Sequence, residues 1–176
     1  MDTPNQVGVI GQSCPSRSTG KQGRLSRFWA QYFTFYDALN LAQPYRSVIE
    51  QHAALLGLKK SDHILDAGTG TGNLAVELAA RGDRVMGIDF CSEALDICRQ
   101  KLPGADFRFG DLTRALEFAS GSFDHVTCCW VLHLLEPPAQ ASAVREFFRV
   151  LKPGGRLAAS LCARCASRPM TAWFDS

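Results

Sequence analysis

The chain has 176 residues, of which 46% are hydrophobic and 20% charged, and its formal net charge is +2 at pH 7. This length fits one domain that can bury a hydrophobic core. No apolar run approaches the ~20 residues that a membrane-spanning helix needs, and the basic residues are scattered rather than gathered in a stripe. We therefore expect a soluble protein with neither a nucleic-acid nor a membrane partner.

Seven cysteines occur without a secretory signal in front of them. This combination is typical of reduced thiols in a cytoplasmic protein rather than of a disulfide framework. Cys162 and Cys165 form one C-x-x-C pair, but no second pair stands at metal-ligand spacing. We therefore expect a cytoplasmic protein with no metal site.

The first third of the chain divides into a tail and two helices. Residues 1–24 are rich in Gly, Ser, Thr and Pro and lack periodicity, which is typical of a flexible tail. Over residues 25–60, apolar side chains recur at three- and four-residue steps on both sides of Pro44. This pattern predicts two helices before the first strand.

Residues 61–162 alternate short apolar strands with helical segments. The predicted strands are His63–Ala67, Arg84–Asp89, Asp106–Gly110, Phe123–Val131 and Arg156–Cys162. Five strands alternating with helices predict an α/β fold with a doubly wound, mostly parallel sheet and helices on both faces. In such folds ligands bind beyond the carboxyl ends of the strands.

A glycine-rich turn follows the first predicted strand, in the sequence LDAGTGTGN at residues 65–73. Its glycines allow a tight bend and a close approach to a ligand. A glycine turn alone is weak evidence, but here the spacing is G-x-G-x-G with Asp66 two residues before the first glycine, unlike the G-x-G-x-x-G of dinucleotide sites. The Asp66 carboxylate would repel a pyrophosphate and attract the cationic methionine amine of S-adenosylmethionine.

Two further acids follow the next predicted strands. Asp89 ends the second strand, where a carboxylate can accept hydrogen bonds from both hydroxyls of a ribose. Asp111 follows the third strand and can accept from an exocyclic adenine amine, with Leu112 against the ring. Each acid alone is as readily a solvated strand-end carboxylate, but three at successive strand ends are harder to dismiss.

The segments LDAGTGTG, GIDF, FGDL, FDHVTCCWVLHLL and LKPGGRL resemble, in order and spacing, the successive motifs of class I (Rossmann-like) S-adenosylmethionine-dependent methyltransferases of the small-molecule type. The resemblance covers roughly residues 61–160, and the combination is far more specific than any single motif. It implies the strand order 3-2-1-4-5. It also implies in-line methyl transfer from S-adenosylmethionine to a small-molecule acceptor, leaving S-adenosylhomocysteine.

The resemblance also assigns residues to the cofactor. The implied cofactor-binding positions are Asp66, Gly68, Thr69, Gly70, Gly72, Asp89, Phe90, Asp111, Leu112, Cys129 and Trp130. Cys129 and Trp130 would line the methionine end, and the first helices, with Tyr32, Tyr36 and Tyr45, would form a lid.

His133, just past the fourth strand, is the candidate general base for an acceptor that must lose a proton. A histidine in an apolar run is more often simply packed, so both readings stay open. The acceptor's identity and the methylated atom also stay open. The motifs of amino-methylating DNA enzymes, cytosine C5 enzymes and arginine methyltransferases are absent from the sequence.

The chain departs from the family after the fifth strand, where members continue with a helix and an antiparallel hairpin. Residues 163–176 are too few for that hairpin and predict only a short tail, as in a chain truncated after strand five. The alternative function is therefore a non-catalytic module that binds S-adenosylmethionine. A nicotinamide-dependent oxidoreductase is disfavoured by Asp66 and by the glycine spacing.

The fifth strand carries no proline, lysine or other charge in its middle, which is the composition of an interior strand. With no further strand to pair with it, its edge would expose unpaired N–H and C=O groups. We therefore expect self-association through this edge.

Overall fold

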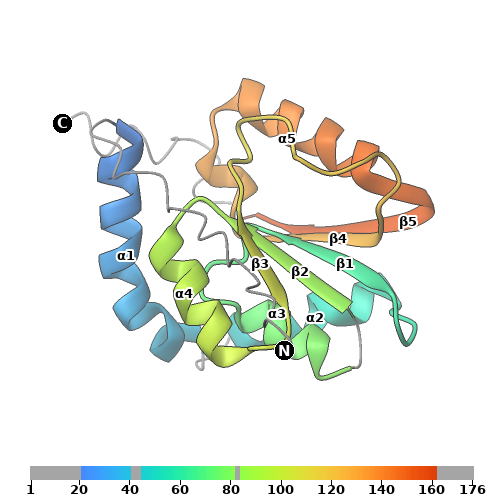
Figure 1. Ribbon diagram of the computed structural model, residues 1–176, viewed down its shortest axis with the longest axis horizontal. Helices are drawn as coiled ribbons and strands as arrows, with labels where there is room; N and C mark the ends of the chain where they lie inside the picture. Colours follow the sequence, from blue (N-terminus) through green and yellow to red (C-terminus); the bar gives the residue numbers. More distant parts are fainter. Residues whose placement is uncertain (1–20, 41–44, 82–83, 162–176) are drawn as a thin grey trace, which may run out of the picture.

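The computed structural model describes residues 21–40, 45–81 and 84–161. Two helices, α1 (Lys21–Asn40) and α2 (Tyr45–Leu56), precede the sheet (Figure 1). α1 begins inside the 1–24 segment for which the sequence predicts a tail. Residues 1–20 and 162–176 lie outside the described part. The predicted C-terminal tail, the expected absence of the hairpin and the Cys162–Cys165 pair all fall on residues 162–176.

The sheet has five strands, all parallel, in the order β3-β2-β1-β4-β5, which confirms the predicted fold class and strand order. The strands are β1 (His63–Ala67), β2 (Arg84–Asp89), β3 (Asp106–Phe109), β4 (Phe123–Cys129) and β5 (Leu151–Ser160). β1 and β4 lie at the centre, where almost every residue is buried, as expected for strands covered on both faces.

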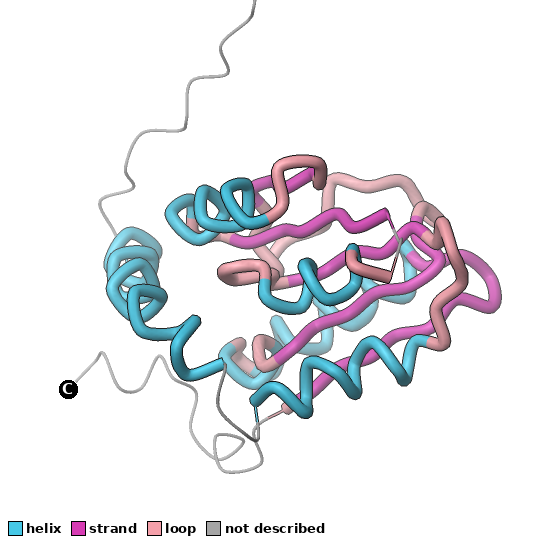
Figure 2. The backbone as a smooth tube through the Cα atoms, turned by 90° about the horizontal axis from the view of Figure 1, so that it is seen from below, coloured by secondary structure: helices cyan, strands magenta, loops and turns pink. Residues whose placement is uncertain are grey.

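Helices cover the two faces of the sheet unequally. Figure 1 shows α5 (Pro137–Val150) above the sheet, with α2 and α3 (Asn73–Ala79) beneath it. α4 (Ser92–Lys101) packs in the same layer as α2 and α3, because its Leu95 and Cys98 belong to the hydrophobic cluster that those two helices form. Between β3 and β4 the chain crosses without a helix, and Leu112 and Leu116 from that loop complete the core under α5. The tube in Figure 2 shows the same layers from below, with α1 standing beside them.

The predicted start of the fifth strand is wrong, because β5 begins at Leu151 and not at Arg156. Between the pairs Phe123–Leu151 and His125–Arg156, β4 advances by two residues and β5 by five, so the Pro-Gly-Gly run forms an irregularity inside the strand. β3 and β4 end one and two residues earlier than predicted, at Phe109 and Cys129.

The described ranges contain no helix that is both long enough and apolar enough to cross a membrane. They also contain no group of three or more His, Cys, Asp or Glu side chains placed to hold a metal ion. None of the four cysteines within these ranges forms a disulfide: Cys91, Cys98, Cys128 and Cys129.

Candidate functional site

The glycine loop, residues 68–72, lies between the carboxyl end of β1 and the start of α3. The main-chain N–H groups of Gly68 and Thr69 both donate to the carbonyl oxygen of Ile88, at 2.8 and 3.0 Å, and so hold the loop against β2. The pairing of β1 with β2 brings Asp66 and Asp89 to the same edge of the sheet. The loop and the two acids therefore form one site.

Gly68 meets two demands that exclude other residues. Its φ is +79°, a left-handed conformation that side chains rarely adopt. A Cβ at this position would also stand 2.5 Å from Cγ2 of Val131, the second residue after β4. The close approach of the two segments therefore requires glycine. Thr69 and Gly72 close the turn, through a 2.9 Å bond from the Gly72 N–H to the Thr69 carbonyl.

Asp89 is buried, and its carboxylate accepts main-chain hydrogen bonds from both sides. The Gly70 N–H donates to Oδ2 and the Cys91 N–H to Oδ1, each at 2.9 Å. Burial raises the pKa of Asp89, and these N–H donors oppose the rise. Asp89 thus positions the glycine loop, a structural role that its place at a strand end did not predict. Phe90, the next residue, is half-buried.

Asp66 is 1% exposed, and the Thr69 hydroxyl donates to its Oδ2 at 2.7 Å. Burial raises the pKa of Asp66 to about 7. The Thr69 hydrogen bond lowers it, and the charge of Asp89 raises it further. A group with positive charge beside Asp66 would favour its ionised form, so the site suits a cationic ligand.

Asp111 lies at the carboxyl end of β3 and shapes its own turn. Its Oδ1 accepts from the main-chain N–H of Thr113 at 2.9 Å and from the Thr113 hydroxyl at 2.7 Å, and Arg114 Nε lies 3.6 Å from its Oδ2. Leu112 is buried and packs with Ile88 in the core. The structure therefore places Asp111 at the predicted edge of the sheet and gives Leu112 a packing role.

The side chains of Cys129 and Trp130, at the end of β4, contact different parts of the molecule. The Cys129 thiol accepts a hydrogen bond from the Ser160 hydroxyl at 3.4 Å and lies within electrostatic reach of Asp66, and burial raises its pKa to about 11. The Trp130 ring instead packs edge-on against Tyr45, the first residue of α2. Cys129 is therefore within electrostatic reach of Asp66, whereas Trp130 contacts α2, and the role of Trp130 at the methionine end stays a prediction.

Helix α1 covers the glycine loop through two residues that sequence reasoning missed. A Cβ on Gly70 would lie 3.5 Å from the Phe33 ring, which packs with Cys91 and Ala94 of the α4 region. Asp37 accepts from the Thr71 hydroxyl at 2.7 Å. The signal for both was weak, because an aromatic and an acid are ordinary residues on an amphipathic helix.

Asp37 also joins two residues beyond the loop. The Asn73 amide donates to its Oδ1 at 3.0 Å, and Lys101 Nζ lies 2.7 Å from its Oδ2. Burial raises the pKa of Asp37, but the hydrogen bonds from Lys101, Thr71 and Asn73 outweigh burial and lower it. The contacts hold α1 to α3 and α4.

The three tyrosines expected in a lid occupy different places. Tyr36 is within electrostatic reach of Asp66 and Cys129, and burial raises its pKa well above the usual range. Tyr32 packs among the α1 rings, and Tyr45 contacts Trp130. Tyr36 is thus the one of these three tyrosines whose pKa the charge of Asp66 affects.

His133 lies in a short 3₁₀ helix, η1 (Leu132–Leu134), just after β4. Its Nδ1 is buried and has no hydrogen-bond partner among the described residues. Burial also lowers the pKa of the imidazole, so the neutral form predominates at neutral pH. A neutral imidazole can accept a proton, and the lowered pKa makes this one a weaker base than an exposed histidine.

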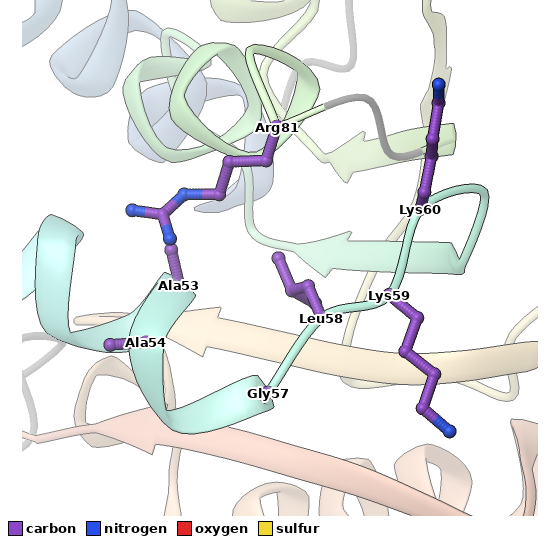
Figure 3. Close-up of a pocket in the computed structure, with 7 residues that line it drawn as sticks. All are labelled: Ala53, Ala54, Gly57, Leu58, Lys59, Lys60 and Arg81. Atoms are coloured by element: carbon purple, nitrogen blue, oxygen red, sulfur yellow. The ribbon is translucent and has the colours of Figure 1, made fainter.

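A depression of about 320 Å³ lies at the opposite end of the sheet, near the amino ends of β1 and β2. It is lined by Ala53, Ala54, Gly57, Leu58, Lys59, Lys60 and Arg81. Figure 3 shows the side chains of Lys59 and Lys60 pointing in opposite directions, so they do not converge on one anion. This depression is separate from the acids and the glycine loop.

The chain is similar in sequence to known proteins. Residues 64–155 match the model of a family described as a methyltransferase domain. A demethylmenaquinone methyltransferase of Beutenbergia cavernae is 37% identical over 102 residues, which are 58% of this chain and 41% of the relative. The chain spans about two fifths of the length of the curated relatives it matches first.

Solved structures are similar as well. A SAM-dependent methyltransferase of Methanosarcina mazei has a TM-score of 0.54 at 34% identity, over 58% of this chain and 53% of the other. A TehB-like SAM-dependent methyltransferase of Corynebacterium glutamicum has a TM-score of 0.64 over 82% of both chains. At 24% identity, the second similarity shows the shared fold.

Proposed function

We propose that this chain, which belongs to the methyltransferase domain family, binds S-adenosylmethionine at the glycine loop and transfers its methyl group to a small-molecule acceptor. The observation that carries the proposal is the convergence of two buried carboxyls, Asp66 and Asp89, on that loop. Burying a carboxylate is costly unless it is paired or hydrogen-bonded. A cationic amine beside one and ribose hydroxyls beside the other are suitable partners.

The Asp66 carboxyl fits the methionine amine. An ionised carboxylate has about four lone-pair sites, and Thr69 is the residue that donates to it. The remaining lone pairs can accept hydrogen bonds from an ammonium group. A positively charged partner would lower the pKa of Asp66, which burial raises to about 7, and so favour the ionised form. A pyrophosphate at the same loop would be repelled, which disfavours a nicotinamide dinucleotide.

The Asp89 carboxyl fits the ribose. The Gly70 and Cys91 N–H groups leave acceptor capacity on its two oxygens for the sugar hydroxyls. The same bonds fix the carboxylate before a ligand arrives, so little ordering is needed on binding.

His133 is the residue we propose as general base. The bound cofactor supplies an electrophilic methyl group on a positively charged sulfur. His133, neutral at pH 7, accepts the proton that the acceptor loses as it attacks. Phe33 and Tyr36 on α1 exclude water from the loop and the acids, and alignment of the reacting atoms supplies the rest of the acceleration.

Because two similar curated proteins are demethylmenaquinone methyltransferases, a quinol is the acceptor to test first. A ring carbon of a quinol becomes nucleophilic when a neighbouring hydroxyl loses its proton. The proposed acceptor therefore needs a base such as His133.

The test is transfer of labelled methyl from S-adenosylmethionine to a reduced naphthoquinone. We expect labelled product with the unaltered chain, and a kcat lowered roughly 10²-fold in His133→Gln with the same KM for the cofactor. If S-adenosylhomocysteine binds but neither quinols nor other small acceptors are methylated, the chain is a binding module and the proposed activity is wrong.

A further inference from the structure

We propose that Trp130 and Tyr45 form one wall of the acceptor site and select a flat aromatic ring. This inference rests on the function proposed above and assigns residues to its second substrate. Neither ring belongs to the three hydrophobic clusters of the described core. Trp130 directly follows Cys129, the last residue of β4, and Tyr45 is the first residue of α2.

The backbone of Trp130 is held in an unfavourable conformation. Its φ is +56°, and among the described residues Ser61 is the other non-glycine residue with a positive φ. For a bulky residue this conformation persists only when surrounding contacts enforce it, and such residues cluster at functional sites. The positive φ therefore marks Trp130 as a candidate functional residue.

Ser160, the last residue of β5, enforces the conformation. The Trp130 N–H donates to the Ser160 carbonyl oxygen and to its hydroxyl oxygen, both at 3.2 Å. The same hydroxyl donates to the Cys129 thiol. One serine thus clamps the end of β4 to the end of β5.

The three consecutive side chains at this end of β4 have three different neighbours. Cys129 lies within electrostatic reach of Asp66, and Val131 covers Gly68. The Trp130 ring instead contacts Tyr45, with ring centroids 5.0 Å apart and an angle of 75° between the planes. The aromatic pair therefore stands next to the proposed methionine end without occupying it, where an acceptor must lie for in-line transfer.

The two rings are available to a ligand. Tyr45 is 37% exposed and Trp130 is partly exposed. Edge-to-face pairs leave an aromatic face free, and a third flat ring gains from stacking or edge contact with it. A quinol offers such a ring, whereas an aliphatic acceptor gains only apolar contact. A quaternary ammonium would also be attracted to these faces, through cation–π interaction.

The experiment measures binding of 1,4-naphthoquinone by calorimetry in the presence of saturating S-adenosylhomocysteine. The variants are Trp130→Gly, which tolerates the positive φ, and Tyr45→Ala, with Tyr45→Phe to keep the ring. Phe148→Ala, which removes an exposed ring from α5 on the far layer, is the matched control.

We expect naphthoquinone to bind at least tenfold more weakly to Trp130→Gly and Tyr45→Ala, and within twofold of the unaltered chain to the other two variants. S-adenosylhomocysteine should bind all five proteins alike. Unchanged naphthoquinone affinity in Trp130→Gly, or tighter binding of tetramethylammonium than of naphthoquinone, would overturn the inference. Failure of S-adenosylhomocysteine to bind the unaltered chain would instead contradict the proposed function.

Discussion

The main-chain N–H of Gly70 donates a 2.9 Å hydrogen bond to Oδ2 of Asp89, which joins the glycine loop to the end of β2. One carboxylate thus holds the loop and faces the proposed ribose site. Binding and folding are therefore coupled at Asp89.

Replacement of Asp89 should affect both properties. Asp89→Ala leaves the buried N–H groups of Gly70 and Cys91 unpaired, and we expect it to lower the free energy of unfolding by ~1–3 kcal/mol. S-adenosylhomocysteine should bind this folded variant more weakly. Asp96→Asn, at an exposed acid on α4, is the control. Urea unfolding and calorimetry measure the two effects. If Asp89→Ala were as stable as the parent, the hydrogen bonds to Asp89 would contribute nothing to the free energy of unfolding.

Cofactor binding should depend on pH through Asp66. Because its pKa is raised to about 7, the carboxyl is mostly protonated at pH 6 and mostly ionised at pH 8. The affinity for the amine of S-adenosylhomocysteine should therefore rise about tenfold between these pH values. Calorimetry should show no such rise in Asp66→Asn. An equal pH dependence in the variant would assign the titration to another group.

The same carboxyl gives the unliganded chain the opposite dependence. A group with a raised pKa in the folded state favours folding below its unfolded pKa, near 4, and this contribution is lost as the pH rises through 7. Unfolding measured from pH 4 to pH 8 should show this loss for the parent relative to Asp66→Asn.

Asp37 should control the opening of α1. Asp37→Asn weakens the contacts with Thr71 and Lys101. Because Asp37 is partly exposed, we expect the free energy of global unfolding to fall by less than ~1 kcal/mol. The amides of α1 should exchange faster, while those of β1 and β4 do not change. Glu50→Gln, in an exposed ion pair of α2, is the control. Equal exchange in the parent and in Asp37→Asn would show that Asp37 does not hold α1 in place.

The second edge of β5 should promote self-association. Within the described residues β5 pairs only with β4, and residues 157–160 carry no charge. We expect sedimentation to show concentration-dependent association, reduced by Ala159→Lys at an exposed position and not by Phe148→Lys on α5. A monomer at every concentration, with protected β5 amides, would argue against an open edge.

The local pattern of apolar and turn residues was enough to predict most strands of the sheet. β1 and β2 have the predicted bounds, because each is a short apolar run between turn residues. The start of β5 was missed, since Pro153-Gly154-Gly155 has the composition of a turn and only pairing with Phe123 makes Leu151 part of the strand.

The site was partly predictable for the same reason. Strand order alone brings Asp66 and Asp89 to one edge, so their meeting follows from topology. The contacts of Asp37 with Thr71, Asn73 and Lys101 join segments far apart in sequence, and no local pattern encodes them. The left-handed backbone of Trp130 depends on Ser160 in the same way.

The most direct test is a calorimetric titration of S-adenosylhomocysteine into the unaltered chain, with NAD titrated in parallel. We expect saturable binding of S-adenosylhomocysteine, none of NAD, and a gain in unfolding free energy of ~2.7 kcal/mol at a hundredfold excess over Kd. No heat and no stabilisation at millimolar S-adenosylhomocysteine would contradict a cofactor site built on Asp66, Asp89 and the glycine loop.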